Sequence, residues 1–150
     1  MRMKQPVFVL PEAMQSLIAL GAAASRGGVP YTTLKLVELR SSQINGCSVC
    51  VEMHSRELRK AGEVDDRIFA VSAWRETPCF TDAERAALAL TEATTRIADR
   101  ADGVPQEIWD EAAQHYDEKA LAALLVAIAG INAWNRLNVA VRQVAGDWMG

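Results

Sequence analysis

Two cysteines and a histidine stand close together in the segment SQINGCSVCVEMH, residues 42–54. Cys47 and Cys50 are three residues apart, and His54 follows Cys50 by four residues. On a helix that begins at Cys47, each residue turns by about 100°, so the three side chains fall on one face. Two thiols beside an imidazole are suited to thiol redox chemistry or to metal binding.

A cysteine attacks as a thiolate, so near neutral pH it needs a base or a positive field. Cys47 would lie at the helix N-terminus, where unsatisfied N–H groups and the helix dipole favour an anion. Cys50 would have the imidazole of His54 one turn away. The two effects favour different cysteines, and the spacing alone leaves open which one attacks.

Three interpretations of this segment follow from the residues alone. The first is a redox dithiol. The second is a zinc site made by Cys47, Cys50 and His54, although the usual second Cys/His pair is missing. The third is a buried cluster without chemistry, because cysteine is a common core residue.

The composition of the chain indicates an ordinary globular protein. A length of 150 residues fits one domain, spanning 1–150, with half of the residues apolar and 23% charged. The net charge of −3, without a cluster of Lys and Arg, argues against a nucleic-acid partner.

No membrane segment is expected either. The longest apolar run, residues 120–131, is shorter than the roughly 18 to 20 residues that cross a bilayer, and the first residues lack a signal-peptide core. We therefore expect a cytoplasmic protein. In that reducing compartment a close cysteine pair is more plausibly reactive or metal-bound than structural.

Apolar residues recur at helical spacing along nearly the whole chain, which predicts an all-α fold of about six to seven helices. Asn45 and Gly46 would reverse the chain before Cys47, Thr81 begins a capping box, and Asp117 caps the last helix. That helix is apolar on nearly all sides in its first half, so it should be buried centrally or between subunits. The predicted helices cover residues 11–25, 30–45, 47–61, 64–74, 81–98, 105–116 and 118–144.

The segments 36–63 and 70–93, with INAWNR at 131–136, resemble the alkylhydroperoxidase D (AhpD) and carboxymuconolactone decarboxylase superfamily. The resemblance covers roughly residues 34–95, and its CxxCxxxH core after SQING is specific. It implies an AhpD-like helical bundle that assembles as a homo-oligomer, a trimer or a hexamer, with the cysteine pair near a subunit interface.

The resemblance also implies a thiol-dependent peroxidase or disulfide reductase. Cys50 would attack a hydroperoxide, Cys47 would resolve the sulfenic acid and donate a proton, and His54 would relay the proton. No cofactor is implied beyond the Cys47–Cys50 disulfide, which a dithiol donor, lipoyl or thioredoxin-like, would reduce.

Two positions depart from the family pattern. The glutamate that polarises the histidine would lie twelve residues before the first cysteine, where this chain has Lys35, so Glu38 is the nearest candidate, nearly one turn along. Val49 stands where the characterised peroxidase has an additional histidine. Glu52, on another face of the helix, is expected to be exposed.

Two further functions are alternatives: a decarboxylase acting on a lactone acid, which needs no paired thiols, and a non-enzymatic zinc-binding or structural helical module. The other notable side chains are interpreted structurally. We expect Cys79 to fill space in a turn and His115 to lie at the surface. Tryptophans at helical spacing (Trp74, Trp109, Trp134) indicate core or interface, and asparagines on the last helix (Asn132, Asn135, Asn138) indicate hydrogen bonds between helices or subunits.

Overall fold

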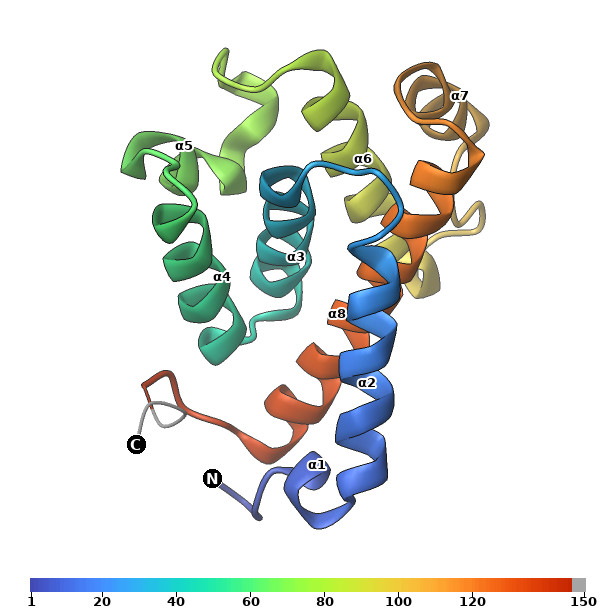
Figure 1. Cartoon of the computed structure of the whole chain (residues 1–150). Coiled ribbons are helices and arrows are strands. Elements are labelled where there is room, and N and C mark those ends of the chain that lie inside the picture. Colours follow the sequence, from blue (N-terminus) through green and yellow to red (C-terminus); the bar gives the residue numbers. More distant parts are fainter. Residues whose placement is uncertain (147–150) are drawn as a thin grey trace.

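The computed structural model describes residues 1–146, and over this range the regular structure is entirely helical (Figure 1). This confirms the predicted all-α class. The α-helices are α1 (Pro6–Val9), α2 (Pro11–Ala24), α3 (Tyr31–Asn45), α4 (Ser48–Lys60), α5 (Asp65–Ala70), α6 (Asp82–Thr95), α7 (Gln106–His115) and α8 (Glu118–Val141), with 3-10 helices η1 (Val71–Glu76) and η2 (Ile97–Asp99).

Each predicted segment contains a helix, with differences at the ends. The segment expected as one helix over 64–74 consists of α5 followed by η1, and Ala73 inside η1 has non-helical dihedral angles. The residues at the end of the predicted helix 81–98 form η2 instead of continuing α6. The last helix ends at Val141, where Arg142 adopts a left-handed conformation.

The predicted caps are present. Thr81 and Glu84 form a capping box, in which each side chain bonds the other residue's backbone N–H. The side chain of Asp117 accepts a hydrogen bond from Ala120 N at 2.8 Å. Gly46 ends α3 with a φ of 69°, a conformation that glycine adopts without steric cost.

Helix α3 lies at the centre of the fold, packed against α4, α6 and α8 (Figure 1). Its two sides belong to different apolar clusters. Leu34 and Val37 pack with side chains of α6 and α8, whereas Leu36 and Leu39 pack with side chains of α4, η1 and α6. Because α3 is buried on both sides, its C-terminal end holds the following turn in a fixed place.

Helix α8 is apolar enough and long enough, by length and composition alone, to cross a membrane: it has 24 residues, and its most apolar window has a mean hydropathy of 1.5. Half of that window is buried within the fold, where α8 packs against α2, α3 and α6. Of the two arrangements predicted for this helix, burial within the fold is found for half of its most apolar 18 residues. Such burial is typical of the core helix of a globular protein.

The first helix, α1, was not predicted. Gln5 caps it through its side chain and Pro6 occupies its first turn, a position that tolerates proline because its missing N–H would be unpaired there. Arg2 N donates to Val141 O at 2.8 Å. The N-terminal segment is thereby tied to the end of α8, far away in the sequence.

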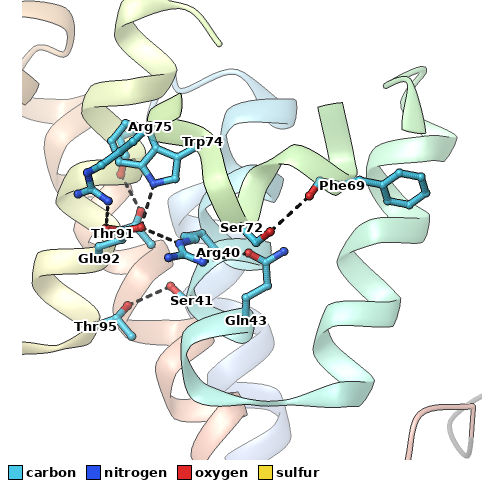
Figure 2. A network of polar contacts seen from close by, with 11 residues as sticks. Arg40, Ser41, Gln43, Phe69, Ser72, Trp74, Arg75, Thr91, Glu92 and Thr95 are labelled. Atoms are coloured by element: carbon cyan, nitrogen blue, oxygen red, sulfur yellow. Dashed lines mark hydrogen bonds and ion pairs between the residues drawn. The ribbon is translucent and has the colours of Figure 1, made fainter. Parts of the chain in front are cut away.

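A buried carboxylate joins α6 to α3 and η1 (Figure 2). Glu92 accepts hydrogen bonds from Arg40 Nε at 2.7 Å and from Trp74 Nε1 at 2.9 Å, and Arg75 pairs with its other oxygen. Burial would raise the pKa of Glu92, but hydrogen bonds from Trp74, Arg75 and Arg40 bring that pKa below its ordinary value. Trp74 is buried, as predicted.

Candidate functional site

The cysteine pair lies in the turn that joins α3 to α4. Cys47 is the N-cap of α4, and its backbone N–H donates to Ser42 O at 3.0 Å, so the turn is held by the end of α3. The sulfurs of Cys47 and Cys50 are joined in a disulfide, with the two Cα atoms 5.4 Å apart. Each cysteine is only 1% exposed. The predicted shared face is confirmed for the two sulfurs.

His54 lies further along α4 and is buried. Its Nδ1 is 2.8 Å from Glu57 Oε2 and 3.3 Å from Glu38 Oε2. Among the described residues, the buried Nε2 atom has no hydrogen-bond partner, so no hydrogen bond joins the ring directly to either sulfur. An ionised carboxylate only accepts hydrogen bonds, so Nδ1 carries the proton that is donated to the carboxylates.

Lys35 completes this polar group. Its Nζ lies 2.7 Å from Glu38 Oε2 and 3.3 Å from Glu57 Oε2. Burial would lower the pKa of Lys35, but the two carboxylates raise it above its ordinary value. The hydrogen bond from His54 and the charge of Lys35 lower the pKa of Glu57, against the effect of burial. The position that the resemblance assigned to a glutamate therefore holds the cation of the same cluster.

Sequence reasoning identified Glu38 and missed Glu57. Glu38 approaches the imidazole from α3, as its position nearly one turn from Lys35 indicated. Glu57 is three residues after His54 on the same helix, and this spacing was a signal that could have identified it. Glu52, expected to be exposed, is partly buried and pairs with Arg56 at 2.7 Å.

Asn138 of α8 was also missed as a site residue. Its Nδ2 lies 3.2 Å from Cys50 Sγ and 3.7 Å from Cys47 Sγ, and its Oδ1 accepts a hydrogen bond from Gln5 Nε2. For the other two asparagines the prediction is confirmed, because Asn45 Nδ2 of α3 donates to the side-chain oxygens of both Asn132 and Asn135 of α8 at 2.9 Å. The prediction was incomplete for Asn138, which contacts the sulfurs.

A cavity of about 660 Å³ adjoins the disulfide. Cys50 and His54 line it, whereas Cys47 does not. One wall is polar and comes from α3 and α4, with Lys35, Glu38 and Glu57. The lining residues from α1, α2 and α8 are mostly apolar, and the larger ones are Val7, Phe8, Met14, Leu17, Ile18, Val126, Ile131 and Trp134.

The zinc site considered from the sequence is not assembled here. The sulfurs of Cys47 and Cys50 are bonded to each other, and His54 Nδ1 faces carboxylates. Glu38, His54 and Glu57 bring their ligand atoms within 4.8 Å of one another. However, the Lys35 ammonium already contacts both carboxylates, so their negative charge is paired with a cation of the protein itself instead of a metal ion.

The remaining predicted residues lie apart from this chemistry. Cys79 lies in the turn before α6, as expected, but it is an exposed free thiol, so the expectation that it fills space was wrong. His115 is exposed, as predicted, with Nε2 3.3 Å from Glu111 Oε1. Trp109 is partly buried against the main core, and Trp134 packs partly buried beside the cysteine pair.

Residues 10–93 match the model of the Carboxymuconolactone decarboxylase family. The chain belongs to the Carboxymuconolactone decarboxylase family. Among relatives of this family member, the uncharacterized protein YdfG of Bacillus subtilis (strain 168) is 35% identical over 139 residues, which cover 93% of each chain. The uncharacterized protein YnjA of Escherichia coli (strain K12) is 32% identical over 106 residues, 71% of this chain and 57% of YnjA.

Solved structures agree with this assignment. ATU0492 of Agrobacterium tumefaciens, a protein of unknown function suggested to be the antioxidant defence protein AhpD, has a TM-score of 0.88 and 35% identity, over 96% of this chain and 97% of its own. The family member is thus AhpD-like in fold. The debrominase Bmp8 in complex with 2,3,4-tribromopyrrole has a TM-score of 0.80 over 91% of this chain and 72% of its own; at 22% identity, this likeness concerns the fold alone.

Proposed function

We propose that this protein is a thiol-dependent peroxidase or disulfide reductase that acts through the Cys47–Cys50 pair. One observation carries the proposal: the two sulfurs are close enough to bond, and Cys50 lines a cavity next to a buried imidazole. A structural disulfide needs neither the cavity nor the imidazole. The AhpD-like family membership supports the same chemistry.

In the proposed reaction the thiolate of Cys50 attacks the terminal oxygen of a hydroperoxide. An S–O bond forms, the O–O bond breaks, and the departing alkoxide takes up a proton to leave as an alcohol. Cys47 then attacks the sulfur of the Cys50 sulfenic acid, so that the disulfide forms and water leaves. Cys50 has the attacking role because it lines the cavity, whereas Cys47 does not.

His54 would serve as the proton carrier. Glu57 and Glu38 hold its Nδ1, which leaves the buried Nε2 to accept the proton of the Cys50 thiol and return it to the departing oxygen. Because no hydrogen bond joins the imidazole to a sulfur, the transfer passes through a substrate oxygen or a water. Lys35 balances the charge of the two carboxylates.

The apolar wall of the cavity favours an organic hydroperoxide over hydrogen peroxide. Side chains such as Phe8, Leu17 and Ile131 would surround an alkyl or aromatic group while the peroxide oxygens face Cys50. A dithiol donor, lipoyl or thioredoxin-like, would supply the two electrons that restore both thiols. We place the protein in the cytoplasm as a trimer or a hexamer.

Consumption of cumene hydroperoxide in the presence of a small dithiol tests the proposal. Cys50→Ser should abolish turnover, and Cys47→Ser should leave a sulfenic acid on Cys50 that dimedone traps. Cys79→Ser is the matched control and should turn over like the parent protein, because Cys79 is an exposed free thiol outside the pair. Undiminished turnover by Cys50→Ser would eliminate the mechanism.

A decarboxylase acting on a lactone acid is less well supported by the cavity. Such a substrate brings carboxylates, which call for free cationic groups. Among the residues that line the cavity, all within the described part of the chain, Lys35 is the one lysine or arginine, and it already contacts Glu38 and Glu57.

A further inference from the structure

The amide of Asn138 faces the disulfide with its nitrogen. Asn138 Nδ2 lies 3.2 Å from Cys50 Sγ and 3.7 Å from Cys47 Sγ. The oxygen and nitrogen ends of an amide have almost the same shape, so the neighbours decide which end meets the sulfur. The difference matters because an N–H stabilises a thiolate, whereas a carbonyl oxygen repels it.

The structure supplies a fixed starting point for this orientation in α1. The backbone N–H of Val7 donates to the Gln5 side chain at 2.9 Å. A backbone N–H can only donate, so the Gln5 atom that it contacts must be the oxygen, Oε1. Gln5 must therefore present its Nε2 at the other end, where it donates to Asn138 Oδ1. With its oxygen engaged, Asn138 has only its N–H groups left for the sulfurs. Gln5 is 5% exposed, so solvent hardly competes for these bonds.

We infer that Gln5 sets the polarity of the Asn138 amide, and that Asn138 donates an N–H to Cys50 and stabilises its thiolate. Asn138 thus touches the reacting atom, and Gln5 is a positioning residue that acts through it. The inference rests on the proposed function in one respect, namely that Cys50 works as a thiolate. It adds two residues, from opposite ends of the chain, to the chemistry of that thiolate.

The charged groups around Cys50 indicate why a hydrogen-bond donor would matter there. The charged or titratable groups that line the same cavity are Lys35 and Glu38 on α3 and His54 and Glu57 on α4. The lining residues of α1, α2 and α8 carry no charge. The carboxylates of Glu38 and Glu57 each oppose a negative charge on Cys50, and the ammonium of Lys35 is shared between them. The Asn138 amide is a donor that comes from α8, whose lining residues carry no charge.

The pKa of Cys50 tests the inference directly. In a chain carrying Cys47→Ser and Cys79→Ser, Cys50 is the remaining thiol, and absorbance at 240 nm follows its ionisation with pH. Asn138→Leu should raise this pKa by roughly one unit, the effect of losing a hydrogen bond to a charged group. Gln5→Met, which is neutral and of similar size, should raise it in the same direction by a smaller amount, because the Asn138 amide is then free to turn.

Two matched substitutions separate this effect from general loosening of the fold. Asn132→Leu removes an asparagine of the same helix that bonds Asn45 and Thr95 instead of sulfur, and Gln106→Met alters an exposed glutamine that bonds Asp110. Neither should move the pKa of Cys50. If Asn138→Leu does not fold, the isosteric Asn138→Asp replaces it and should raise the pKa further, because a carboxylate then faces the thiolate.

Each result decides one part of the inference. An unchanged pKa in the Asn138 variants would overturn the donor role of Asn138. A shift with Asn138→Leu but none with Gln5→Met would overturn the positioning role of Gln5. Because ionisation is read without a substrate, these results hold even if the parent protein consumes no hydroperoxide, so failure of the proposed function is seen separately.

Discussion

The carboxylate of Glu92 provides the clearest stability prediction. In Glu92→Gln the shape of the side chain is kept, but the charge that pairs with Arg40 and Arg75 is lost. The Arg40 side chain is 14% exposed, so its guanidinium would be left without its ion-pair partner in a mostly buried place. Breaking one partner of a buried pair costs about 3–5 kcal/mol, and partial solvation of Arg40 argues for the lower end, about 3 kcal/mol.

Arg75 supplies the matched comparison, because its side chain is 54% exposed although it contacts the same carboxylate. Exposed ion pairs contribute about 0–1 kcal/mol, so Arg75→Ala should lower the free energy of unfolding by less than about 1 kcal/mol. Trp74 Nε1 keeps an acceptor in Glu92→Gln if the amide oxygen faces it, which limits the loss to the charge.

Urea unfolding followed by circular dichroism measures both changes, at one fixed protein concentration because subunit association would add to the apparent stability. The midpoint should fall strongly for Glu92→Gln and little for Arg75→Ala, with similar slopes. Equal losses in the two variants, or a loss below about 1 kcal/mol for Glu92→Gln, would refute the reasoning from burial.

Three further predictions concern packing, acid stability and catalysis. A Cβ added at Gly27 would lie 2.1 Å from Ala123 Cβ, so Gly27→Ala should lower the free energy of unfolding by about 1–3 kcal/mol. An unchanged urea midpoint would show that the turn after α2 approaches α8 less closely. The pKa of Glu57 lies below its ordinary value of 4.5, so the stability that its carboxylate contributes is present above pH 4.5 and is lost as the pH falls through the lowered pKa. Glu57→Gln should therefore make the free energy of unfolding depend less on pH in this acid range. An equally steep pH dependence in the variant would contradict the lowered pKa of Glu57. Glu57→Gln should also slow hydroperoxide reduction by roughly tenfold or more. The loss should exceed that of Glu38→Gln, because Glu57 lies 2.8 Å from His54 Nδ1 and Glu38 lies 3.3 Å from it. A larger loss of kcat/KM in Glu38→Gln would show that Glu38 orients the imidazole instead.

The fold was largely predictable from the sequence because its signals are local. Helical periodicity, the Thr81 capping box and the glycine at position 46 each depend on residues a few positions apart, and the structure contains all of them. The first helix escaped prediction because four residues carry too little periodicity. The kink inside η1 depends on the conformation of Ala73, which no residue type in that segment indicates.

The site was predictable only where it follows one helix. The two sulfurs share the face that their spacing indicated, Cys50 and His54 line the same cavity, and Glu38 lies where helical geometry allowed it. Asn138 reaches the sulfur of Cys50 across 88 residues of sequence, and Gln5 reaches Asn138 across 133. Such contacts depend on how the chain ends pack, and no local pattern encodes them.

The oxidation of the cysteine pair by its substrate is the central claim, and counting free thiols tests it most directly. The reduced protein has three cysteines, of which Cys79 is outside the pair. One equivalent of cumene hydroperoxide should lower the free thiols from three to one per chain, and a small dithiol should restore them. Three thiols remaining after treatment, or a loss confined to Cys79, would contradict the account.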